Sequence, residues 1–154
     1  MSSAAAISFT IPGLPVAWAR AGRGGGVTFT PAKQRSFMAD CRTIAAAAMK
    51  GRAPLSGPIE MSVVFAYPWP ASWSAKKRAA PGAEWKVSRP DGSNLRKLIE
   101  DAINGVVYGD DAQIASGHDW KRFEDSAETR VQIRSLAEAP AEIAADRVFA
   151  GAAE

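Results

Sequence analysis

An amphipathic segment at residues 94–104 constrains the fold more than any other feature of this sequence. Its apolar side chains are spaced three or four residues apart, at Leu95, Leu98, Ile99, Ala102 and Ile103. At about 100° per residue they form a single stripe along a helix. Asn104-Gly105 follows the stripe, and such a pair is typical of the left-handed end of a helix. The segment therefore predicts a helix that must bury one side against other elements.

Strands are the predicted partners of this helix. Residues 7–11 alternate between apolar and polar side chains, which indicates a half-buried strand. Residues 59–67 alternate at first and are then continuously apolar, as expected for a central strand. We expect residues 27–30 to form a hairpin with residues 7–11.

The remaining elements follow from local signals. Thr30-Pro31 predicts the N-cap and first position of a helix that runs to about Met49 and is closed by Gly51. Residues 72–78 predict a short basic helix. Residues 114–123 and 129–136 predict a closing hairpin. The order of elements indicates an α+β fold, with one small mixed sheet and helices packed on one face.

The length of 154 residues and the apolar content of 47% suit one domain with a single core. We expect this domain at residues 1–136, followed by an Ala- and Glu-rich tail at 137–154 that is disordered or loosely helical. The longest aliphatic stretch is too short to cross a bilayer, and the N-terminus lacks the basic residues of a secretory signal. These features predict a cytoplasmic protein without a membrane partner.

Charge is distributed unevenly along the chain. Residues 1–90 carry twelve Lys and Arg against three acidic residues, whereas residues 91–154 carry seven against thirteen. A basic first part suits contact with a polyanion such as nucleic acid. It is equally compatible with an ordinary solvated surface.

Acidic residues flank the predicted helix at both ends. Asn94, Lys97 and Asp101 share a face beside the apolar stripe, Asp91 precedes the helix, and Asp110-Asp111 follow it. A helix folded back on a strand could bring the two acidic ends together around Lys97. Carboxylates near a lysine suit magnesium-dependent phosphodiester cleavage, in which the metal activates water and the lysine offsets developing charge.

The same residues allow a structural interpretation. Asp91 is a good N-cap residue, Lys97 and Asp101 are an ordinary i,i+4 pair, and Gly109-Asp110-Asp111 suits a surface turn. The pattern alone leaves both interpretations open.

A resemblance decides between them. Pro90-Asp91-x-x-Asn94-Leu95-x-Lys97 is followed by Asp101-Ala102-x-Asn104-Gly105 and then by Asp110-Asp111-x-Gln113-Ile114. Upstream blocks agree, namely Gly13-Leu14-Pro15-Val16, Phe29-Thr30-Pro31-Ala32-Lys33 and Pro70-x-Ser72-Trp73-Ser74-x-Lys76-Lys77. Over residues 7–136 the chain resembles the RusA-type Holliday-junction resolvases of phages and prophages.

This resemblance implies a homodimer that cuts branched DNA such as four-way junctions in recombination and repair. It implies Mg²⁺ as the cofactor, for which Mn²⁺ can substitute. By position, Asp91, Lys97 and Asp111 match catalytic residues, and Asp91 and Asp111 match metal ligands. Asp110 and Ser93 are further candidate ligands, with Asn94 and Asp101 in support.

One departure from the family pattern lies in this site. The family commonly has Pro-Asp-x-Asp-Asn, and here the second aspartate is Ser93. A neutral hydroxyl is a weaker ligand for a hard cation than a carboxylate. Asp110 or Asp101 could take over that role. The alternative function is a protein of the same fold that binds junctions or single-stranded DNA and cleaves little.

Candidate phosphate-binding residues lie mostly in the basic first part of the chain: Arg20, Arg23, Lys33, Lys76, Lys77, Arg78, Lys86 and Arg89. Trp69, Trp73 and Trp85 lie between them. Such aromatic side chains either stack on unpaired bases or pack within the protein.

Overall fold

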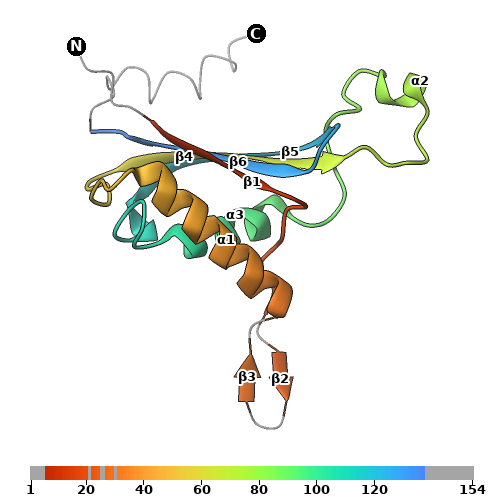
Figure 1. The fold of residues 1–154 in the computed structure, drawn as a ribbon. Coiled ribbons are helices and arrows are strands. Elements are labelled where there is room, and N and C mark those ends of the chain that lie inside the picture. The colour runs from red at the N-terminus through yellow and green to blue at the C-terminus, as the bar shows by residue number, and fades with distance from the viewer. Residues whose placement is uncertain (1–5, 21, 25–26, 30, 138–154) are drawn as a thin grey trace.

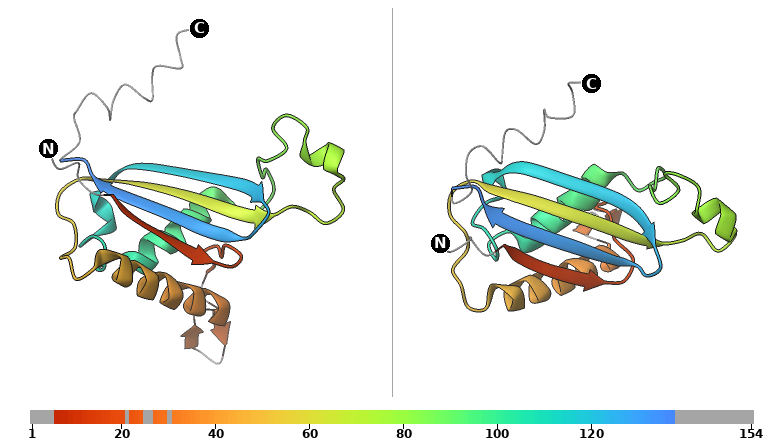
Figure 2. Two further views of the ribbon diagram at one scale, coloured as in Figure 1. Left: turned by 45° about the horizontal axis from the view of Figure 1, so that its top comes forward. Right: turned by 90° about the horizontal axis from the view of Figure 1, so that it is seen from above.

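A four-stranded sheet and two helices form two layers in the computed structural model, which describes residues 6–20, 22–24, 27–29 and 31–137. Helices α1 (Ala32–Met49) and α3 (Gly92–Ile103) cover one face of the sheet (Figure 1). Within the described residues, no helix covers the other face (Figure 2). The predicted α+β class, with helices on one face of a mixed sheet, is confirmed.

The sheet has the strand order β1-β6-β4-β5. Its strands are β1 (Ile7–Pro12), β4 (Ile59–Pro68), β5 (Ile114–Glu124) and β6 (Glu128–Ser135). β1 shows the predicted alternation of buried and exposed residues. β4 is central, as expected, because it pairs with β5 on one side and β6 on the other.

The predicted closing hairpin between residues 114–123 and 129–136 is wrong. β4 lies between β5 and β6, parallel to β5 and antiparallel to β6. The chain leaves β4 and crosses the sheet through α3, and a crossover of this kind returns the next strand parallel to the first. The alternation of apolar and polar residues predicts where each strand lies in the sequence, but it does not predict which strand pairs with it in the sheet.

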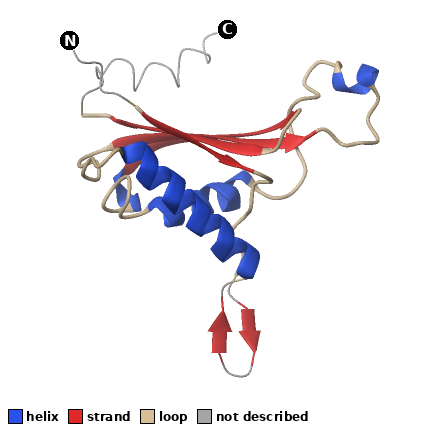
Figure 3. Ribbon diagram, viewed as in Figure 1, coloured by secondary structure: helices blue, strands red, loops and turns tan. Residues whose placement is uncertain are grey.

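The predicted hairpin between residues 7–11 and 27–30 is also wrong. β1 pairs with β6, while β2 (Gly22–Gly24) and β3 (Val27–Phe29) pair with each other in a separate ribbon near the start of α1 (Figure 3). The N-cap residue of α1 is Pro31, one residue later than expected, and Thr30 lies outside the described residues. Met49 ends α1, and Lys50 rather than Gly51 is the first left-handed residue.

The core lies between the sheet and the two helices. Met61, Val63 and Phe65 of β4 are at most 1% exposed and belong to the same buried cluster as side chains of α1 and α3. The predicted stripe of α3 is buried along its whole length: Leu95, Leu98, Ile99, Ala102 and Ile103. This packing fixes which side of α3 faces solvent.

An arm at residues 69–85 projects from one end of the sheet and carries α2 (Ala75–Arg78) (Figure 1). The helix is shorter than predicted because it begins after Ser74, whose hydroxyl accepts a hydrogen bond of 3.2 Å from the backbone N–H of Lys77. In the described part of the chain, no helix has the length and apolar character needed to span a membrane. The predicted tail lies outside the described residues from position 138 onward.

Candidate active site

Asp91 occupies the N-cap position of α3 without capping it. Its backbone is extended, with φ −69° and ψ 140°, and its carboxylate accepts no hydrogen bond from the first turn. The side chain is exposed. N-cap aspartates ordinarily satisfy one of the free N–H groups at a helix start. Asp91 is thus the N-cap residue of α3, as the structural interpretation expected, but it lacks the side-chain hydrogen bond of a cap, so its carboxylate can bind a group from outside the chain.

A second carboxylate, which the sequence did not single out, lies over the first residue of α3. Oδ2 of Asp119, on β5, is so close to Gly92 that a Cβ atom there would overlap it. Oδ1 of Asp119 is 3.4 Å from Nη1 of Arg96. Gly117 is the corresponding small residue on β5, where the Arg96 guanidinium fills the space of the missing side chain. These two glycines are the one sequence signal of a close approach between α3 and β5.

Lys97 and Asn94 lie on the solvent side of α3. Nζ of Lys97 is 3.7 Å from Oδ2 of Asp101, which confirms the i,i+4 pair, and 5.7 Å from the ring centroid of Trp18. The carbonyl of Asn94 accepts a hydrogen bond of 3.0 Å from the backbone N–H of Trp18. Lys97 is about half exposed, so its ammonium group can reach a bound polyanion.

Asp110 has a structural role. It is the N-cap residue of the short helix η1 (Asp111–Gln113), and its Oδ1 accepts a hydrogen bond of 2.9 Å from the backbone N–H of Ala112. This bond is the main reason that the pKa of Asp110 lies below its ordinary value. A carboxylate held in this way has less freedom to coordinate a cation than its neighbour.

Asp111 lies close enough to Glu100 for its charge to act on it. The sequence analysis did not identify Glu100 as a candidate site residue. Burial raises the pKa of Glu100, and the negative charges of Asp111 and Asp101 raise it further, while Arg96 opposes the shift. The Tyr108 hydroxyl donates a hydrogen bond of 2.7 Å to the carbonyl of Glu100, which joins this end of α3 to the segment before Asp111.

The acidic residues thus form two groups along α3. Asp91 and Asp119 lie at its N-terminus, whereas Glu100, Asp101 and Asp111 lie toward its C-terminus. At 1.5 Å of rise per residue, roughly 13 Å of helix separates Asp91 from Glu100. Among residues 6–20 and 31–137, whose side chains the structure describes, no three His, Cys, Asp or Glu side chains meet closely enough to hold a metal ion.

The donor chemistry of this region suits a hard cation. Both groups offer carboxylate oxygens, and Ser93 adds an exposed hydroxyl one residue after Gly92. Magnesium binds through one or two carboxylates and keeps several waters, so it does not require a cage of three protein side chains. Among these donors, the exposed carboxylate of Asp91 fits this requirement best, because it accepts no hydrogen bond from the first turn of α3.

Aromatic packing shapes the basic arm. Trp69, Trp73 and Phe123 form a cluster with ring centroids 5.3 to 6.1 Å apart. Nζ of Lys77 is 4.4 Å from the Trp73 centroid, and the Arg78 guanidinium is 5.8 Å from that of Trp69. These two tryptophans therefore pack against each other and against Phe123 of β5. This aromatic packing fixes the position of the arm that carries Lys76, Lys77 and Arg78.

The other candidate phosphate-binding lysines and arginines differ in how exposed their side chains are. Lys76, Arg89, Arg20 and Lys33 are exposed, whereas the side chain of Arg23 lies outside the described residues. Nζ of Lys86 donates to the carbonyl and hydroxyl of Ser88, and burial lowers its pKa. Lys86 is thus occupied in holding the loop that precedes Asp91.

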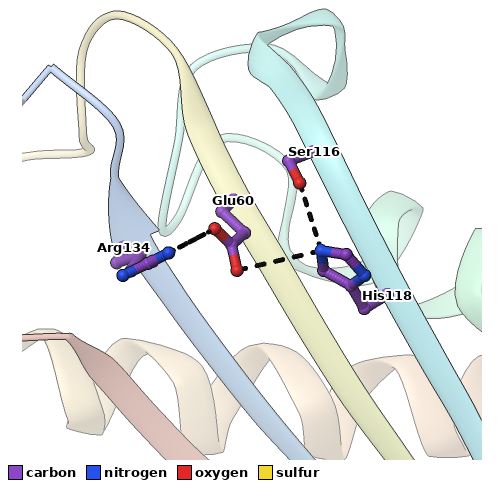
Figure 4. Close-up of polar contacts among 4 residues, drawn as sticks. All are labelled: Glu60, Ser116, His118 and Arg134. Atoms are coloured by element: carbon purple, nitrogen blue, oxygen red, sulfur yellow. Dashed lines mark hydrogen bonds and ion pairs between the residues drawn. The ribbon is translucent and has the colours of Figure 1, made fainter. Parts of the chain in front are cut away.

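The uncovered face of the sheet carries paired charges. Oε2 of Glu60 is 2.6 Å from Nη2 of Arg134, Oε1 is 3.9 Å from Nε2 of His118, and the Ser116 hydroxyl is 3.2 Å from the same His118 nitrogen (Figure 4). Beside them is a hollow of about 500 Å³ that includes Trp120 and Arg130 in its lining. Because Arg134 balances Glu60, this face is a poor cation site.

The small α+β fold, with exposed carboxylates around α3 and Lys97 on its solvent side, is compatible with a metal-dependent nuclease. The chain belongs to the endodeoxyribonuclease RusA family, whose pattern it matches over residues 12–134. Membership implies endodeoxyribonuclease activity on Holliday junctions. The chain is also 28% identical over 137 residues to the uncharacterized protein YqaN of Bacillus subtilis (strain 168), a match that covers 84% of this chain and 96% of that protein.

Proposed function

We propose that this protein is a magnesium-dependent, structure-selective endodeoxyribonuclease that resolves Holliday junctions in recombination and repair. The observation that carries this proposal is the carboxylate of Asp91, which is exposed and leaves the helix start uncapped. Asp91 and Asp111 would be metal ligands, each in its own acidic group along α3, with Mn²⁺ able to replace Mg²⁺. When bound, such a cation activates water and stabilises the leaving oxygen.

Lys97 would assist by electrostatics. Its ammonium group is exposed and paired only loosely with Asp101, at 3.7 Å, so it can turn toward a phosphate. A positive charge there offsets the negative charge that develops on the reacting phosphodiester. Asn94 has a supporting role, because its carbonyl anchors the segment after β1 beside the same helix.

The arm and the exposed arginines would bind the DNA backbone. Lys76 and Lys77 are exposed on α2, and Nζ of Lys77 lies over the ring of Trp73, which packs against Trp69. Arg20, Lys33 and Arg89 extend the basic surface. Such contacts give affinity without sequence preference.

A homodimer is part of the proposal. A four-way junction has two symmetry-related strands to cut, and each chain contributes one Asp91 and one Asp111. Two copies related by a two-fold axis match the symmetry of that substrate.

The experiment that tests the function is cleavage of a four-way junction and of a matched linear duplex. We expect cutting of the junction with Mg²⁺ or Mn²⁺, and binding without cutting in Ca²⁺. Junction binding without cutting in any metal would favour the second candidate, a DNA-binding protein of the same fold. The observation in favour of that candidate is the neutral Ser93 together with the separation of the two acidic groups.

A further inference from the structure

We propose that Asp119 supplies the carboxylate that Ser93 does not, next to Asp91 at the N-terminus of α3. This inference rests on the proposed metal-dependent function and concerns how this chain completes its site. Neither of the two replacements suggested by the sequence is placed for this role. Asp110 caps η1, and Asp101 lies toward the C-terminal end of α3, eight residues after Ser93.

The geometry of Asp119 carries the inference. Its Oδ2 lies over Gly92, the residue between Asp91 and Ser93 in the chain. Oδ1 is the oxygen that faces Arg96, which leaves Oδ2 directed at the start of α3. A carboxylate at a helix N-terminus is electrostatically favourable. Asp119 therefore places a charged oxygen beside the position where the family commonly has its second aspartate.

Asp119 has access to solvent and is only weakly bound to Arg96. Its side chain is 27% exposed, so a hydrated cation can reach it. The distance of 3.4 Å to Arg96 is long for a charged hydrogen bond. Arg96 already has a shorter partner, since its Nε is 2.9 Å from Oε1 of Glu100. The positive charge of Arg96 is therefore balanced by Glu100 and does not require Asp119.

Gly92 gives a second way to test the arrangement. A side chain at this position would displace the Asp119 carboxylate, because even a Cβ atom would overlap Oδ2. Alanine is otherwise the better residue in a helix. Gly92→Ala should therefore move Asp119 from the site without neutralising it or weakening α3.

The experiment measures Mn²⁺ binding to the full chain by the loss of the free-ion electron paramagnetic resonance signal. We expect Asp119→Asn and Gly92→Ala each to raise the dissociation constant about tenfold or more. Ser93→Asp should restore binding in Asp119→Asn, because it returns a carboxylate to the same cation. Asp125→Asn, in the exposed turn after β5, is the matched control and should leave binding unchanged. Thermal melting without metal verifies that each variant is folded.

The outcomes separate this inference from the proposed function. If Asp91→Asn abolishes Mn²⁺ binding while Asp119→Asn and Gly92→Ala bind as wild type, Asp119 is not a ligand and the metal site stands without it. If Ser93→Asp fails to rescue Asp119→Asn, the two positions do not serve one cation, and the inference is overturned. A wild-type chain that binds no Mn²⁺ would overturn the inference and the proposed metal dependence together.

Discussion

Asp110 and Gln113 hold each other's backbone in a reciprocal pair. The Asp110 side chain caps the turn that leads to Gln113, and Oε1 of Gln113 accepts a hydrogen bond of 3.0 Å from the backbone N–H of Asp110. Nε2 of Gln113 also donates to the carbonyls of Leu55 and Gly57, each at 2.9 Å. The Asp-Asp-x-Gln block thus fixes one turn, and it presents Asp111 from that turn.

The two adjacent aspartates should therefore respond differently to the same substitution. Asp110→Asn retains an N-cap side chain of equal quality, so junction cleavage should stay close to wild type. Asp111→Asn removes a proposed ligand charge and should lower the cleavage rate roughly 10²–10³-fold. Single-turnover cleavage of a four-way junction in Mg²⁺ measures both. Equal losses in the two variants would contradict the division of roles.

Asp91→Asn should abolish cleavage while junction binding in Ca²⁺ remains. Asn has nearly the size of Asp, and the exposed Asp91 side chain makes no capping hydrogen bond that the substitution could remove. The melting temperature should therefore not change by more than a few degrees. Gel-shift titration and cleavage of the same labelled junction separate the two effects. Cleavage at the wild-type rate would show that Asp91 is not a ligand.

The arm should account for part of the salt dependence of DNA binding. Neutralising Lys76 and Lys77 by Gln should flatten the slope of log affinity against log salt by roughly 0.9 for each phosphate that the arm no longer neutralises. The matched control is Lys50→Gln with Arg52→Gln, two exposed cations just after the end of α1. Fluorescence anisotropy over a range of salt measures the slopes. A slope changed only by the control pair would place the DNA on that surface.

The chain should be a dimer at micromolar concentration. Two incisions in one junction require two copies of Asp91 and Asp111, so light scattering should report twice the chain mass of 16.3 kDa. Mixing wild type with Asp91→Asn should then give junctions nicked in one strand. Paired nicks from a monomeric solution would be inconsistent with this expectation.

Glu124 and Arg130 should contribute stability that depends on pH. Both oxygens of Glu124 contact Arg130, at 2.7 and 3.1 Å, and these hydrogen bonds lower the pKa of Glu124 from its ordinary value of 4.5. A lowered folded pKa gives stability that is present above 4.5 and is lost as pH falls through the folded value. Both groups are about one-third exposed, so the contribution is at most about 1 kcal/mol.

Urea unfolding of wild type and Glu124→Gln over a series of pH values tests this pair. The variant should be slightly less stable near neutral pH, and the two chains should converge as the pH falls through the lowered pKa of Glu124. Chelator in all samples removes any effect of metal. A difference that persists in acid would assign the effect to packing instead of charge.

Local sequence determined the elements of this protein. The stripe from Leu95 to Ile103 fixed the buried side of α3, and the alternation at residues 7–11 and 59–67 fixed two strands, because helix and strand periodicity are properties of the chain itself. The same periodicity placed Lys97 and Asp101 together on the solvent side of α3. The spaced motifs around Asp91 and Asp111 identified the family.

Only the tertiary structure decided which elements are neighbours. β4 separates β5 from β6, although these two strands follow each other in the chain, because pairing depends on the path of the crossover through α3. The same crossover lays Asp119 over Gly92, across more than twenty residues of sequence. A contact of this kind leaves no periodic trace in the sequence, since it depends on the missing side chain of one glycine and on the packing of a helix against a strand.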